Sequence, residues 1–229
     1  MTERDLVSQY RATRARIIDR VAVLDDAGSR RMVPACPEWT VRDILAHVTG
    51  IAADLGAGRM PGPSTQAWID GHVSDRKDRP LDRVIDEWLG AGVEAFIEES
   101  GSGQLLLDVC AHEHDICQAL GQVGDRESDA VNACLSAMSE LLRKDLLARG
   151  APASVALTSR GRSWTVGEGP VGLMLEAEPF EMLRIFGGRR SEHQMRALPW
   201  KNADGSVADV GPWLALLAHF PYPVADLVE

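Results

Sequence analysis

The sequence has no apolar run approaching the roughly 20 residues that a membrane-spanning helix requires. It also has no excess of basic residues: 24 lysines and arginines stand against 34 aspartates and glutamates, for a formal net charge of −10 over 229 residues. An acidic surface repels phosphate backbones. We therefore expect neither a nucleic-acid partner nor a membrane association.

Cysteine pairs with the spacing of a zinc ligand set are absent as well. The charged start of the chain, Met1–Asp5, contains no apolar segment of the kind found in signal peptides. We expect a cytoplasmic protein whose cysteines are free thiols, with no structural zinc site built on sulfur. The four cysteines are Cys36, Cys110, Cys117 and Cys134.

The first two-thirds of the chain show the periodicity of amphipathic helices, with apolar residues recurring at steps of three and four. Thr40 and Asp43 have the spacing of a capping box, which marks a helix start. The stretch 56–80 is rich in glycine and proline and is predicted to be a long loop, either functional or disordered. The predicted helices span residues 6–24, 40–55, 80–98, 105–120 and 130–146.

The pattern changes after Gly150. Short β-prone segments and two short helices follow, and these predict a different architecture from the first part. We therefore expect an α+β protein, with a helical bundle over residues 1–150 and a small mixed α/β domain over residues 151–229. The predicted strands are 154–159, 163–166 and 171–177, and the short helices are 179–186 and 191–198.

The predicted helix 105–120 carries an unusual number of ionisable residues. At about 100° per residue, His112 falls within the apolar stripe and Asp108 lies at its edge. His114 is expected to point to the opposite side. Because Asp108 and His112 are four residues apart, their side chains can converge on one point.

His47 lies at the edge of the apolar face of the helix 40–55, so it can join Asp108 and His112 in one inward pocket. Three such ligands with one open position are typical of a catalytic zinc site, and the same donors also suit iron, nickel or manganese. Two alternatives stay open at this point. The histidine can be a satisfied core residue, and the Asp–His pair can be a simple hydrogen-bonded pair.

Residues 36–47 have the sequence CPEWTVRDILAH, and residues 108–116 contain an acidic residue and a histidine four positions apart, followed by Asp115 and Ile116. These two segments resemble the signatures, the first of them CPxWTVRDxxAH, of the mycothiol-dependent maleylpyruvate isomerase family, a branch of the DinB-like metal-binding bundles. Residues 180–184 and 188–191 are similar to its small C-terminal domain. The resemblance implies a DinB-like up-down four-helix bundle, followed by a smaller α/β domain.

The resemblance also implies a site. It predicts a divalent metal, usually Zn²⁺, held by His47, Asp108 and His112, although the family pattern has glutamate where this chain has Asp108. It implies mycothiol, the small thiol of actinobacteria, as cosubstrate. Arg189 and Arg190 match a region that supplies an arginine important for activity, and guanidinium groups suit carboxylates. A solvated surface pair is the alternative interpretation of these arginines.

These expectations describe a metal-dependent enzyme that uses mycothiol to isomerise a small unsaturated acid. A thiol S-transferase needs the same metal and the same thiol, so it is one alternative. A non-catalytic module that binds a metal or small ligand is another, and a fourth protein ligand such as His72 or Asp115 would favour it. The physiological substrate and a mycothiol-binding residue are not readable from the sequence. We expect a monomer or homodimer.

Overall fold

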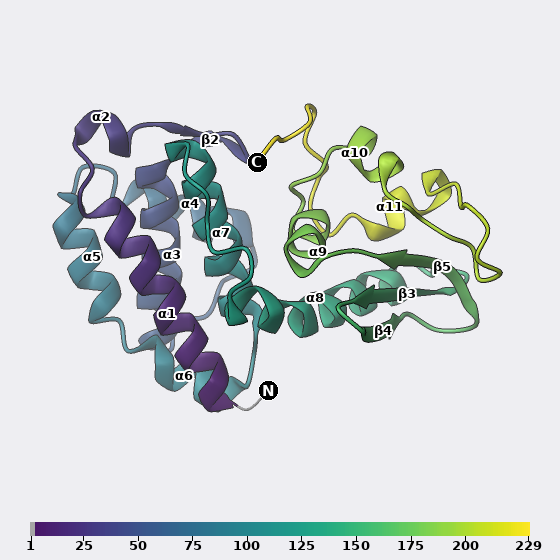
Figure 1. The fold of residues 1–229 in the computed structure, drawn as a ribbon. Helices are drawn as coiled ribbons and strands as arrows, with labels where there is room; N and C mark the ends of the chain where they lie inside the picture. The colour runs from purple at the N-terminus through teal and green to yellow at the C-terminus, as the bar shows by residue number, and fades with distance from the viewer. Residues whose placement is uncertain (1–2) are drawn as a thin grey trace. The chain divides into compact units, whose positions relative to one another are not determined.

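The computed structural model describes residues 3–229, and their side chains from Asp5 onward (Figure 1). Met1 and Thr2, part of the charged start, lie outside the described residues. The chain divides into two units, Met1–Gly124 and Asp125–Glu229. The first is helical with one small hairpin and the second mixes helices and strands, so the fold is α+β as expected. Within residues 3–229, no helix combines the length and the apolar character needed to span a bilayer.

The first unit is a helical bundle with a closed ring of contacts. The first helix packs against the last, which packs against the third, and a broken helix formed by two short pieces completes the ring. Tyr10, Ile17, Ile44 and Trp88 are fully buried between them. The ring consists of α1 (Glu3–Val21), α7 (Gln104–Leu120), α3 (Val41–Gly56), and the pieces α5 (Leu81–Leu89) and α6 (Val93–Ser100).

The predicted helix 80–98 is interrupted in the structure. Helix α5 ends at Leu89 and α6 begins at Val93, with Gly92 between them at a φ of 68°. This left-handed conformation is open to glycine and costly for residues with a Cβ. The break lets the chain change direction, so that α5 packs on α3 while α6 contacts both α1 and α3.

The predicted loop 56–80 is wrong in part, because it contains the helix α4 (Thr65–Ser74). Ser64 caps this helix by accepting a hydrogen bond from the backbone N–H of Ala67. Helix α4 packs against α3 and buries His72 there. Glycine and proline on either side of α4 mark real loops, but they hide a helix of only ten residues between them.

The sequence pattern also missed a small element before α3. After the short helix α2 (Asp26–Ser29), strands β1 (Met32–Val33) and β2 (Cys36–Thr40) form an antiparallel hairpin. Their register pairs Met32 with Thr40 and Val33 with Cys36. Strand β1 contacts α7 and β2 contacts α3, so this hairpin bridges the two helices that carry the predicted metal ligands.

The second unit contains the three predicted strands. They form one sheet of order β4-β3-β5, in which β3 is antiparallel to β4 and parallel to β5. The helices before and after the sheet are α8 (Asp129–Ala148), α9 (Pro179–Phe186), α10 (Glu192–Ala197) and α11 (Leu214–Leu217), and a 3₁₀ turn, Gly211–Trp213, precedes the last of these. The strands are β3 (Ser154–Ser159), β4 (Arg162–Val166) and β5 (Val171–Glu176).

The division between the units lies between Gly124 and Asp125, not near the expected residue 150. Helix α8 is the reason, because its neighbours include β4, α9 and α11 of the second unit. Its periodicity predicted a buried face correctly: Leu142 and Leu146 are buried. A periodic pattern does not say which partner covers that face, so the sequence assigned α8 to the wrong unit.

Candidate metal centre

His47 lies on α3, whose start is fixed by a local sequence signal. Thr40 is the N-cap residue: its hydroxyl accepts from the backbone N–H of Asp43, and the Asp43 carboxylate accepts from the backbone N–H of Thr40. This is the capping box that the sequence predicted. It sets the phase of α3, and this phase turns His47 inward, where its side chain is only 5% exposed.

Asp108 and His112 lie one turn apart on α7. The His112 side chain is 8% exposed and that of Asp108 is 29% exposed, which agrees with an inward histidine and an aspartate at the edge of the apolar stripe. The expectation that His114 faces outward is wrong, because it is only 3% exposed. The chain after α7 folds back over it: a Cβ on Gly124 would lie 2.4 Å from the His114 Nδ1 atom.

The three expected ligands converge. The Nε2 atom of His47 lies 3.6 Å from Oδ1 of Asp108, and the Nε2 atom of His112 lies 3.6 Å from the same oxygen. The centroids of the two imidazole rings are 5.2 Å apart with an angle of 82° between the ring planes. One ligand atom from each residue lies within 4.8 Å of the others, so the three can share one ion.

This donor set fits a divalent metal such as zinc. Ligand atoms about 2 Å from a tetrahedral zinc ion lie about 3.3 Å from one another, close to the separations seen here. Burial lowers the pKa of His47, more than the nearby Asp108 carboxylate raises it. The neutral imidazole, which is the form that binds a metal, is thereby favoured. Among the described residues, the buried Nδ1 atom of His47 has no hydrogen-bond partner.

Trp39 forms part of the wall of this site. It lies on β2, and its ring centroid is 4.9 Å from that of His47 and 6.3 Å from that of His112. The hairpin brings it over both imidazoles, so an apolar surface flanks the ligands and leaves Asp108 as their most exposed member.

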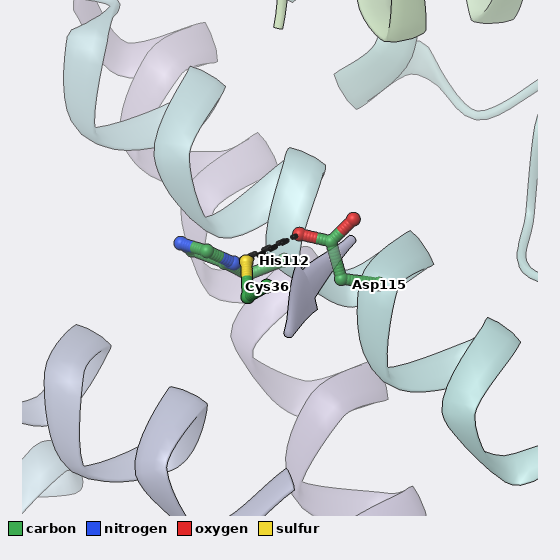
Figure 2. A group of neighbouring side chains, drawn as sticks. All are labelled: Cys36, His112 and Asp115. Carbon is green, nitrogen blue, oxygen red and sulfur yellow. Dashed lines mark hydrogen bonds and ion pairs between the residues drawn. The ribbon is translucent and has the colours of Figure 1, made fainter. Parts of the chain in front are cut away.

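A second contact of His112 was not foreseen from the sequence. Its Nδ1 atom lies 3.0 Å from Oδ2 of Asp115, and the Cys36 thiol lies 4.0 Å from the same oxygen (Figure 2). Asp115 is completely buried and Cys36 is half-buried. The signal was present as an acidic residue three positions after His112, but Cys36 reaches Asp115 only through the hairpin. Cys36, His112 and Asp115 also form a group compatible with metal binding.

His72 and Trp68 lie on α4 and share one acidic partner. The Asp54 carboxylate is 3.0 Å from the His72 Nε2 atom and accepts a hydrogen bond of 2.6 Å from the Trp68 indole N–H. His72 is buried against α3, where a Cβ on Gly50 would lie only 2.3 Å from the imidazole Cγ. His72 is not part of either group of described residues that could hold a metal.

The arginines expected to bind substrate lie in the second unit and are buried. Arg190 is 7% exposed and Arg189 is 9% exposed, so they are not a solvated surface pair. The Arg190 guanidinium donates two hydrogen bonds to Glu181, of 2.7 and 2.8 Å, and one of 2.9 Å to Glu229. Arg189 donates to the Gly187 carbonyl. A catalytic role for either arginine stays a prediction.

Two solved structures resemble most of the chain in fold. One is the crystal structure of a histidine-to-alanine mutant of the mycothiol-dependent maleylpyruvate isomerase, with 12% identity and a TM-score of 0.59. The other is the crystal structure of the mycothiol-dependent maleylpyruvate isomerase, with 14% identity and a TM-score of 0.55. Each comparison covers 91% of this chain and 96% of the other. No curated protein matches the chain.

A sequence match is found for the first unit. Residues 10–103 match the family model of the mycothiol maleylpyruvate isomerase N-terminal domain. The matched range includes His47 and the capping box of α3, and it ends just before α7, which carries Asp108 and His112. The fold likeness extends beyond this range to nearly the whole chain. Over residues 10–103, the chain is therefore similar to the N-terminal domain of mycothiol maleylpyruvate isomerases, and over most of its length it shares their fold.

Proposed function

We propose that this protein is a metal-dependent enzyme that uses a small thiol, in the manner of a mycothiol-dependent isomerase. His47, Asp108 and His112 would hold the metal, most simply Zn²⁺. The observation that carries the proposal is the convergence of the three side chains, with both Nε2 atoms 3.6 Å from one Asp108 oxygen. Three protein ligands leave one position for a thiol or a substrate, which is the pattern of a catalytic site.

A zinc ion in this site would lower the pKa of a bound thiol and polarise a carbonyl group. The residues of the chain itself would bind the metal and orient the small molecules that reach it. The two buried imidazoles would supply the nitrogen ligands, and the Trp39 ring beside them excludes water from that side. Asp108, the most exposed ligand, marks the side from which small molecules reach the centre.

The proposed reaction acts on a small electrophilic or unsaturated acid. A thiolate adds to a carbon of a cis double bond, the resulting single bond rotates, and the thiolate leaves as the trans double bond forms. No atom is gained or lost overall. The proposal adds Arg189 and Arg190 as the groups that pair with the carboxylates of the substrate. For Arg190 this requires exchange with Glu181 or Glu229, which now accept its hydrogen bonds.

The decisive experiment is an incubation of the purified protein with mycothiol and a panel of electrophiles that includes maleylpyruvate, with and without a chelator. Conversion of maleylpyruvate to its trans isomer, lost on chelation and restored by zinc, supports the isomerase. Formation of a stable mycothiol adduct with other electrophiles instead identifies an S-transferase. If the protein retains zinc but no arm of the panel reacts, the protein is a binding module and the enzymatic proposal is wrong.

A further inference from the structure

Asp115 is a buried carboxylate, three residues after His112 on α7. Its side chain has no exposed surface, and burying a charged carboxylate is costly unless hydrogen-bond donors surround it. Two donors meet at one of its oxygens: the His112 Nδ1 atom at 3.0 Å and the Cys36 thiol at 4.0 Å. Figure 2 shows both groups directed at the same side of the carboxylate.

The contact with Asp115 determines which nitrogen of His112 faces the metal centre. An ionised carboxylate only accepts hydrogen bonds, so the imidazole proton resides on Nδ1. The lone pair is then on Nε2, the atom that lies 3.6 Å from Asp108. A histidine that binds a metal through one nitrogen commonly donates its other N–H to a carboxylate, which fixes the tautomer and the ring orientation.

We propose that Asp115 is a positioning residue of the metal centre. It holds the His112 ring in the orientation and tautomer in which Nε2 is available as a ligand, and the Cys36 thiol steadies Asp115 by donating to the same oxygen. This inference rests on the proposed metal centre of His47, Asp108 and His112.

The contact of Cys36 with Asp115 has a second consequence, because Cys36 lies on the hairpin. Strand β2 carries Cys36 at its start and Trp39 near its end, and the Trp39 ring lies over His47. The contact of Cys36 with Asp115 on α7 therefore also fixes the position of Trp39, which forms part of the wall of the site. Asp115 thus links the ring orientation of one ligand to the placement of the indole beside the other.

The same three residues could instead hold an ion directly, because their ligand atoms are also close together. The chemistry of imidazole separates the two arrangements. A neutral imidazole has one lone pair, so His112 cannot be a ligand through Nδ1 and Nε2 at the same time. The 3.0 Å separation of Nδ1 and Oδ2 is that of a hydrogen bond. We therefore assign Nδ1 to Asp115 and Nε2 to the metal.

The test measures zinc binding to the full-length chain by competition with a chromophoric chelator, alongside the thermal unfolding of the metal-free and zinc-loaded forms. Asp115→Asn is expected to weaken zinc binding about 10- to 100-fold, the usual effect of removing such a partner. Cys36→Ala is expected to weaken it in the same direction but less, and it provides the same readout if Asp115→Asn does not fold. Glu113→Gln is the matched control. Glu113 is a fully buried carboxylate on the same helix, but it pairs with Arg16.

The outcomes distinguish the inference from the function on which it rests. If the wild type binds no zinc, both fail. If the wild type binds zinc and Asp115→Asn binds it equally well while His112→Ala does not, the metal centre stands and the inference is overturned. If Asp115→Asn loses stability equally in the metal-free and zinc-loaded forms, which is the result expected of the control Glu113→Gln, Asp115 has a structural role only and the inference is also overturned. So does a sulfur-to-cobalt charge-transfer band in the Co²⁺ protein that Cys36→Ala abolishes.

Discussion

The Nε2 atom of His47 on α3 lies 3.6 Å from the Oδ1 atom of Asp108 on α7, although 61 positions separate the two residues (108 − 47). His47 is buried and Asp108 is half-exposed, so the contact lies where the interior of the bundle meets its surface. An imidazole and a carboxylate in this position are suited to hold a cation that a small molecule can still reach.

The first prediction concerns the ligand set. His47→Ala and Asp108→Ala should each lower zinc affinity strongly, because two donors alone cannot complete a stable site. The measurement is zinc stoichiometry by elemental analysis after dialysis against a competing chelator. His193→Ala, in the second unit and 83% exposed, is the control and should retain the wild-type content. Full zinc occupancy in both ligand variants would rule out the set.

The second prediction concerns the close packing of α4 on α3. Gly50→Ala places a Cβ 2.3 Å from the Cγ atom of His72, so one of the two helices must shift. We expect a loss of about 1–3 kcal/mol in the free energy of unfolding, the usual cost of overpacking. Gly71→Ala is the matched control on α4, since nothing lies within 4 Å of its added Cβ. It should stabilise the helix by about 0.5–1 kcal/mol. Equal effects in denaturant titration would contradict this packing.

The third prediction concerns the start of α3. Thr40→Ala removes the hydroxyl that accepts from the Asp43 backbone N–H, and should cost about 1 kcal/mol. Thr40→Ser keeps the hydroxyl and should remain close to the wild type. Urea unfolding followed by circular dichroism measures both. A Thr40→Ser variant as unstable as Thr40→Ala would mean that the threonine methyl group, and not the cap, matters here.

The fourth prediction concerns acid stability. Burial raises the pKa of Glu94, but its own backbone N–H and the guanidinium groups of Arg11 and Arg14 outweigh this and hold it below its usual value. The stabilisation is therefore present above the unfolded-state pKa of about 4.3 and is lost as the pH falls through the lower folded-state value. Glu94→Gln should unfold at a temperature that depends less on pH between neutral and acid conditions.

The control for this pH dependence is Glu98→Gln, because Glu98 is an exposed acid on the same helix. It should keep the wild-type change of unfolding temperature with pH. If Glu94→Gln shows the full wild-type change as well, the ion pairs of Glu94 with Arg11 and Arg14 do not contribute to acid stability.

Local signals in the sequence predicted the parts of the site that depend on one helix at a time. The capping box set the start of α3, and the period of the helix placed His112 inward and Asp108 at the edge. Such signals act over a few residues, because a helix is defined by bonds between residues four apart. The inward direction of the ligands follows from them without knowledge of distant contacts.

The tertiary structure decided which segments cover each face. Periodicity marks one buried face, and α7 is buried on others as well: the chain after it encloses His114, and the hairpin brings Cys36 to Asp115. For the same reason the sequence pattern assigned α8 to the wrong unit, whereas α4 was missed because glycine and proline flank so short a helix. Thus the sequence alone determined the helices and the inward pair on α7. Only the packing of segments far apart in the chain completed the buried surroundings that orient His112.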